Sequence, residues 1–157
     1  EFLKRFAALL RAAPGARQHG AYARAALPRL VADADWVVVP SLWWENAPLV
    51  IQEAHRHRRP VITADIGGMA EMVADGTDGL LFRAGDARAL ADVMKRAAGD
   101  PVLWQQLVQG IRPPMEVEAA ADRHLALYEA LRRQVARPAR RAARPRKQPG
   151  AARREAA

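Results

Sequence analysis

Apolar residues along this chain fall into two patterns, short continuous runs and stripes at helical spacing. The runs at residues 36–39, 61–64 and 80–82 are rich in Val, Ile and Leu, and the first two are typical of strands buried on both faces of a parallel sheet. Helical stripes separate the runs. The sequence therefore predicts an α/β fold, a Rossmann-like parallel sheet flanked by helices.

Turn residues and helix caps set the limits of the predicted helices. Pro14-Gly15 breaks the first helix, Asp86 fits the N-cap of a later one, and Asp100-Pro101 starts a new helix after Gly99. The last helix carries His124 on its apolar stripe, so we expect this histidine to pack against a neighbour. We expect helices near residues 2–10, 27–33, 48–54, 69–73, 87–99, 101–111 and 116–135, and a short strand at 17–20.

The chain of 157 residues is long enough for one domain with a substantial core. It has no cysteine, which excludes a disulfide scaffold, Cys-ligated zinc and an iron–sulfur cluster and fits a reducing, cytoplasmic location. No apolar run approaches the roughly 18 residues of a membrane span. Because the first residue is Glu1 rather than Met, we expect a piece of a longer protein.

The formal net charge is +8, but it is concentrated at one end of the chain. Residues 136–157 carry eight Arg or Lys against one acid, which leaves only +1 for residues 1–135. The Ala/Arg/Pro-rich composition of 136–157 predicts a disordered basic tail behind a domain of residues 1–135. Such a tail could bind polyanions or an anionic membrane surface, which would place the protein at the inner face of the membrane.

Two glutamates flank the start of the helix that follows the first buried run. Glu45 lies in the connecting loop and Glu53 lies in the helix. In an open α/β sheet, ligands bind where strands end and helices begin, and free amides at a helix N-terminus attract anions. A diphosphate between the two carboxylates, with hydroxyl-rich groups at both of its ends, would satisfy all three features. A nucleotide-sugar is such a ligand.

A longer series of residues around these glutamates is more specific than the pair alone. In order and spacing it resembles the donor-binding half of retaining glycosyltransferases of the group 1, or family 4, type, which have the GT-B fold. The resemblance extends from about residue 17 to residue 111. The residues that carry it are Pro40, Ser41, Glu45, Pro48, Leu49, Glu53, Ala54, Pro60, Val61, Ile62, Gly67, Gly68, Glu71, Val73, Gly76, Gly79, Leu80 and Leu81.

The resemblance implies a role for each residue of the loop and helix. Glu45 is expected to be the catalytic-site acid that faces the donor sugar hydroxyls, and Glu53 to hold the ribose of the nucleotide. The turn that contains Gly20 and Tyr22 is expected beside the nucleotide base. The resemblance implies no metal and no cofactor, because the nucleotide-sugar is the substrate. The other implied donor-binding residues are Ser41, Trp44, Asn46, Ala47, Leu49 and Val50.

The implied reaction transfers a sugar from a nucleoside diphosphate to an unidentified acceptor (a glycan, a lipid or a small molecule) with retention at the anomeric carbon. The acceptor-binding N-terminal domain of the family has no counterpart in this sequence, and neither do the Arg and Lys that neutralise the donor diphosphate. We therefore expect an incomplete domain, truncated at its N-terminus and inactive alone, whose unpaired sheet edges favour self-association.

Several residues depart from the family pattern or allow a second interpretation. Arg58 stands where the family has a helix-closing Gly, so we expect this helix to end differently. His55 and His57 point to different sides of the helix and are expected to face solvent. Gly67-Gly68 could approach a ligand closely or simply form a tight turn. The segment Asp33-Ala34-Asp35 resembles a metal-binding motif, but it precedes its strand and so lies at the wrong edge of the sheet.

Two other functions are compatible with the sequence. A nucleotide-sugar 2-epimerase shares the fold, although the loop spacing around Glu45 favours a transferase. A module without catalytic activity could instead use the basic tail to bind polyanions.

Overall fold

The computed structural model describes residues 1–136, and residues 137–157, which make up nearly all of the predicted tail, lie outside the described part. The chain separates into two units, residues 1–114 and a second unit that begins at Met115. The elements, in chain order, are α1 (Phe2–Ala12), the 3₁₀ turn η1 (Arg24–Ala26), α2 (Leu27–Ala32), β1 (Val37–Val39), α3 (Leu49–Arg56), β2 (Val61–Ala64), α4 (Gly67–Met72), β3 (Gly79–Phe82), α5 (Ala87–Gly99), α6 (Pro101–Gly110) and α7 (Val117–Ala136).

The three strands form one parallel sheet in the order β1-β2-β3. Val38 lies opposite Ile62, and Ile62 lies opposite Leu80. Every residue of β2 is buried because β2 is the middle strand, as predicted. Val37 and Val38 of β1 are only half-buried at the edge of the described sheet, so the prediction of burial on both faces is wrong for this strand.

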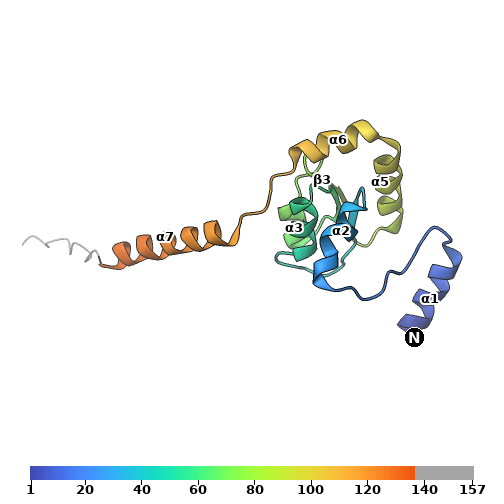
Figure 1. Ribbon diagram of the computed structural model, residues 1–157, viewed down its shortest axis with the longest axis horizontal. Coiled ribbons are helices and arrows are strands. Elements are labelled where there is room, and N and C mark those ends of the chain that lie inside the picture. The colour runs from blue at the N-terminus through green and yellow to red at the C-terminus, as the bar shows by residue number, and fades with distance from the viewer. Residues whose placement is uncertain (137–157) are drawn as a thin grey trace, which may run out of the picture. The chain divides into compact units, whose positions relative to one another are not determined.

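The hydrophobic core lies between the sheet and the helices that flank it. Figure 1 shows the sheet running between α3 and α5. Ile51 of α3, Met69 of α4 and Leu107 of α6 are completely buried in this core. Removing a side chain of this size from water stabilises the fold by about 1.5–3 kcal/mol. The core therefore fixes the helices that follow each strand.

The two helices after the sheet begin at the caps that the sequence predicts. Asp86 Oδ1 accepts hydrogen bonds from the amides of Arg88 and Ala89, both at 3.0 Å. Asp100 Oδ1 accepts from the amide of Leu103 at 2.9 Å. Each carboxylate thus accepts hydrogen bonds from backbone amides of the first turn, which have no acceptor within their own helix. The starts of α5 and α6 are thus confirmed.

Three local predictions are wrong. Residues 16–23 have no regular structure in place of the strand expected at 17–20, because this exposed polar segment offers no apolar face for packing. Helix α4 begins at Gly67, two residues earlier than expected, with Gly67 itself at φ 54°. His124 is exposed rather than buried: its Nδ1 lies 2.7 Å from the carbonyl oxygen of Ala120, and its ring contacts that of Tyr128 in the same helix at 6.5 Å between centroids. Within residues 1–136, no helix combines the length and the apolar character needed to cross a bilayer.

Candidate functional site

The parallel strands end at one edge of the sheet, and the loops that follow β1 and β2 meet there. The loop of residues 40–48 follows β1, and Gly67-Gly68 opens α4 after β2. The amide of Gly68 donates a hydrogen bond to the carbonyl oxygen of Glu45, with an N···O distance of 2.7 Å. This bond fixes the backbone of Glu45 at the carboxyl edge, where ligands of open α/β sheets bind.

Hydrogen bonds within the loop of residues 40–48 order its first half. Ser41 Oγ accepts from the amide of Trp43 at 3.2 Å, and the carbonyl oxygen of Trp43 accepts from the amide of Glu45 at 2.9 Å. Glu45 is half-buried, whereas Trp43 and Trp44 are 75% and 72% exposed. The loop therefore presents a partly buried carboxyl group next to exposed aromatic side chains.

The N-terminus of α3 lies directly after this loop and is open to a ligand. Its N-cap residue, Pro48, is buried and makes no side-chain cap hydrogen bond. The carbonyl oxygen of Pro48 accepts from the amide of Ile51 at 3.1 Å. Leu49 and Val50 are exposed in the first turn, where helix amides lack intrahelical acceptors. These amides and the helix dipole together favour an anion.

Glu53 lies farther along α3, and the packing of the helix fixes its position. Ile51 and Ala54 are buried against the sheet, while Glu53 between them in sequence stays half-buried. The structure thus brings most of the predicted site residues into one loop and the helix that follows it. These residues are Ser41, Trp44, Glu45, Asn46, Ala47, Leu49, Val50 and Glu53.

Gly20 and Tyr22 lie in a separate irregular segment before α2. Gly20 has φ 82°, and the ring of Tyr22 makes an edge contact with His19, with 6.3 Å between ring centroids. Among the described residues, no hydrogen bond or ring contact joins this segment to the Glu45 loop. Their expected place beside a nucleotide base stays a prediction.

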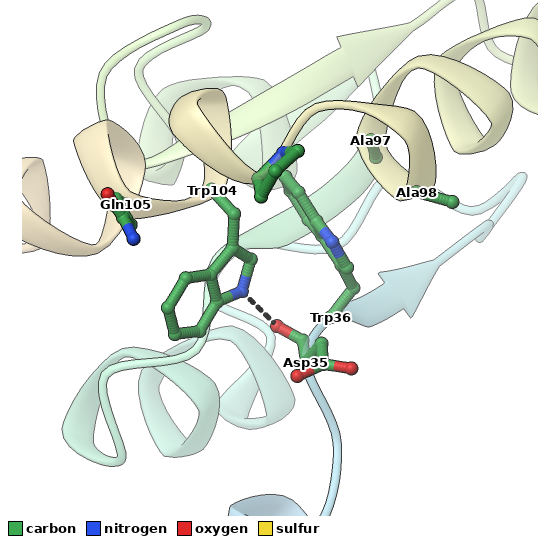
Figure 2. A pocket seen from close by; sticks show the side chains of 7 residues that line it. Asp35, Trp36, Ala97, Ala98, Trp104 and Gln105 are labelled. Carbon is green, nitrogen blue, oxygen red and sulfur yellow. Dashed lines mark hydrogen bonds between the residues drawn. The ribbon is translucent and has the colours of Figure 1, made fainter.

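Hollows lie at both edges of the sheet. A shallow one of about 200 Å³ at the carboxyl edge is lined by Pro40, Leu42, Phe82, Gly85, Asp86, Ala87 and Leu90. A larger one of about 380 Å³ lies at the amino edge, between the start of β1 and the turn that joins α5 to α6 (Figure 2). There Trp104 Nε1 donates to the carbonyl oxygen of Asp35 at 2.9 Å. Asp35 thus lies at the edge opposite the Glu45 loop, as the sequence predicts.

In the part of the chain that is described, no group of three His, Asp or Glu side chains could hold a metal ion.

His55 is buried rather than solvent-facing, so the sequence prediction for it is wrong. It is 6% exposed, and its Nε2 has no hydrogen-bond partner among residues 1–136. Burial lowers the pKa of His55 below its ordinary value, and the nearby charge and backbone of Asp78 partly oppose this effect. Asp78 lies in the turn before β3 and interacts with His55 from outside α3, so periodicity within the helix could not predict this contact. His57 is half-buried.

Arg58 closes α3 in the way that a glycine would, which corrects the expectation of a different helix end. It adopts φ 58°, its amide donates to His55 O at 3.0 Å, and the amide of Arg59 donates to Ala54 O at 2.9 Å. These bonds form the Schellman pattern. The guanidinium of Arg58 donates to Ile111 O at 2.8 Å, which offsets the left-handed conformation's cost of about 1–2 kcal/mol. The sequence alone did not predict this contact, although an arginine in place of the family's helix-closing glycine was a signal that pointed to it.

The pattern of the family described as "Glycosyl transferases group 1" matches residues 2–100. This chain belongs to the group 1 glycosyltransferases. Its parallel sheet flanked by helices confirms the predicted fold class, which it shares with GT-B glycosyltransferases. Neither the epimerase nor the polyanion-binding module is favoured by these similarities.

Known proteins similar to this glycosyltransferase chain match it over part of their length. D-inositol 3-phosphate glycosyltransferase of Streptomyces avermitilis is 34% identical over 115 residues, which cover 65% of this chain and 25% of that enzyme. The structure of sucrose-phosphate synthase from Thermosynechococcus elongatus has a TM-score of 0.68 at 28% identity, covering 83% of this chain and 34% of that one. Anabaena HepE in complex with UDP has a TM-score of 0.54 at 25% identity, covering 71% and 30%. The chain spans 27% and 25% of the length of two curated relatives, the alpha-D-kanosaminyltransferase of Streptomyces kanamyceticus and the Streptomyces avermitilis enzyme.

Proposed function

We propose that this chain forms the donor-binding part of a glycosyltransferase that moves a sugar from a nucleoside diphosphate to an acceptor with retention of configuration. The observation that carries the proposal is the uncapped first turn of α3 at the carboxyl edge, with Glu45 before it and Glu53 after it. The similarity to HepE, which was solved with UDP and with UDP-glucose, supports a nucleotide-sugar donor.

Each part of the proposed donor meets a group of suitable chemistry. The diphosphate lies at the amides of Ala47, Leu49 and Val50, where it accepts charge-assisted hydrogen bonds. Glu53 accepts hydrogen bonds from the ribose hydroxyls, and Glu45 accepts them from the sugar. Ser41, Trp44 and Asn46 line the sugar side of the same site, and Gly20 and Tyr22 lie beside the base.

The proposed reaction breaks the bond between the sugar's anomeric carbon and the diphosphate. Negative charge then develops on the leaving diphosphate, and the preorganised amides of α3 stabilise it without reorganising. The proposal includes no metal ion and no cofactor, and the nucleotide-sugar is the substrate. The acceptor site and the cations opposite the diphosphate belong to other parts of the whole protein in this proposal. Cytoplasmic location, self-association and membrane contact through the tail stay predictions.

Calorimetric titration of residues 1–157 with UDP and UDP-glucose tests the proposal. We expect weak binding of both, and we expect Glu53→Ala to weaken each by about 1–3 kcal/mol, the cost of losing hydrogen bonds to a charged group. The matched control is Glu118→Ala, which removes an exposed acid in α7 and should leave both affinities unchanged. Equal affinities of the wild type and Glu53→Ala would remove Glu53 from the ribose role.

A further inference from the structure

The two glutamates of the proposed donor site are positioned by different parts of the fold. Glu53 lies in α3, whose buried residues Ile51 and Ala54 attach the helix directly to the sheet. Glu45 lies in a loop whose neighbours Trp43 and Trp44 are mostly exposed. Residues 40–47 include no buried residue, so the position of Glu45 depends on backbone contacts of the loop more than on side chains in the core.

The backbone contacts of the loop come from Gly67-Gly68. The amide of Gly68 donates to Glu45 O at 2.7 Å. Gly68 is buried, and a Cβ atom added to it would overlap the carbonyl group of Asn46 and come within 2.6 Å of Glu45 O. At Gly67 the φ of 54° favours glycine, and a Cβ there would lie 3.2 Å from Glu45 O and 3.3 Å from a ring atom of Trp44. The loop backbone thus rests directly on the start of α4.

This packing decides between the two interpretations of the glycine pair. The space beside Gly68 that a side chain would need is filled by the backbone of Glu45 and Asn46. A ligand therefore does not approach Gly68 itself. The absence of side chains at the start of α4 instead permits the loop to approach and its carbonyl to accept the Gly68 amide.

We propose that Gly68 is a positioning residue for recognition of the donor sugar: it sets the place of Glu45 and Asn46 at the carboxyl edge, while α3 independently sets the nucleotide side. The inference rests on the proposed function, because it assigns the sugar to the Glu45 loop and the ribose to Glu53. A side chain at residue 68 displaces the loop and weakens recognition of the sugar more than recognition of the nucleotide.

The chain offers a matched control for the packing defect. Gly110, at the end of α6, also faces a backbone carbonyl, because a Cβ atom added there would overlap the carbonyl group of Thr77. Gly68→Ala and Gly110→Ala therefore create the same kind of clash at different places. Both should lower the melting temperature, but only Gly68→Ala should move the Glu45 loop.

The experiment compares residues 1–157 as wild type, Gly68→Ala and Gly110→Ala, by hydrogen–deuterium exchange without ligand and by calorimetry with UDP and UDP-glucose. We expect Gly68→Ala to speed exchange of the amides at 43–47. We also expect it to weaken UDP-glucose binding at least tenfold and UDP binding by a smaller factor, because UDP keeps the amides of Leu49 and Val50 and loses only that of Ala47. Gly110→Ala should leave the exchange at 43–47 and the ratio of the two dissociation constants at their wild-type values.

Unchanged exchange at 43–47 in Gly68→Ala overturns the positioning role, whatever the ligand data show. Equal weakening of UDP and UDP-glucose overturns the assignment of this loop to the sugar. Failure of the wild type to bind either nucleotide overturns the proposed function and the sugar role with it, while the exchange data still report whether Gly68 sets the loop. If Gly68→Ala does not fold, Gly67→Ala takes its place, because its Cβ makes closer than usual contacts without overlapping a carbonyl.

Discussion

Arg58 Nη1 lies 2.8 Å from the carbonyl oxygen of Ile111, and this hydrogen bond links the end of α3 to the end of α6. The donor is charged and the contact is partly buried, which places it among the stronger side-chain hydrogen bonds. The next residue, Arg59, donates to Ala32 O at 2.7 Å at the end of α2. Two consecutive arginines thus connect the ends of three helices just before β2.

Two substitutions of Arg58 separate its hydrogen bond from its backbone strain. Arg58→Ala loses the bond to Ile111 O and keeps an L-residue at φ 58°, so we expect a loss of about 1.5–3 kcal/mol in the free energy of unfolding. Arg58→Gly loses the same bond but relieves the strain, so it should be about 1 kcal/mol more stable than Arg58→Ala. Urea unfolding measures both. Equal stabilities of the Gly and Ala variants would show that the left-handed conformation carries no cost here.

Burial of His55 predicts a loss of stability in mild acid. Because burial lowers the pKa of His55 in the folded state, the unfolded chain binds the proton more readily. The stability contributed by neutral His55 is complete above the unfolded pKa of about 6.5 and falls as the pH drops below it, by at most about 1.4 kcal/mol per pH unit for one proton.

His55→Met removes this titration and the unpartnered Nε2 together. We expect the variant to be at least as stable as the wild type at pH 7.5 and to lose less stability between pH 7.5 and pH 5.5 in urea unfolding. His57→Gln, at the half-buried neighbour, is the control and should keep the wild-type dependence. An identical pH dependence for His55→Met and the wild type would contradict the assignment to His55.

Trp104 anchors α6 to the amino edge of the sheet through its indole N–H. Trp104→Phe keeps an aromatic ring but loses the 2.9 Å bond to Asp35 O, so we expect a loss of about 0.5–1.5 kcal/mol (Figure 2). Thermal unfolding with Trp43→Phe as control measures this, because Trp43 is 75% exposed and its replacement should change little. A loss of the same size in both variants would show that the bond contributes nothing specific.

The basic residues at the end of the chain predict salt-dependent binding to polyanions. Residues 136–157 carry +7 of the net charge of +8, so their deletion should abolish binding to heparin or DNA that weakens with salt. Elution from a heparin column at increasing salt checks this. Retention of the truncated chain at the same salt concentration would place the polyanion site in residues 1–135.

Local sequence signals were sufficient for most of the elements. The run at 61–64 predicted a buried strand, and Asp86 and Asp100 predicted two helix starts, because patterning and capping act within a few residues. The strand expected at 17–20 failed because pairing requires a partner that local sequence does not specify. The solvent-facing prediction for His55 failed for a similar reason, because Asp78, which interacts with it, comes after β2 in the chain.

The sequence was sufficient to locate the residues of the candidate site, but not to predict the contacts that hold them together. The motif placed Glu45, Glu53 and the start of α3 in one segment, and the structure agrees with that placement. The contact between Gly68 and Glu45 joins residues on either side of β2, and only the paired sheet brings them together. What these residues bind stays a prediction that binding measurements must test.

The position of β2 between two parallel partners has a consequence for how the chain reaches its folded state. Val61 pairs with Val37 on one side and with Gly79 on the other, so neither edge strand can pair natively until β2 is in place. Each pairing also closes a loop that contains a helix, at an entropic cost paid before the sheet is complete. We therefore expect β2 to be structured in the folding transition state. Conservative truncations in this strand, such as Ile62→Val, should slow refolding.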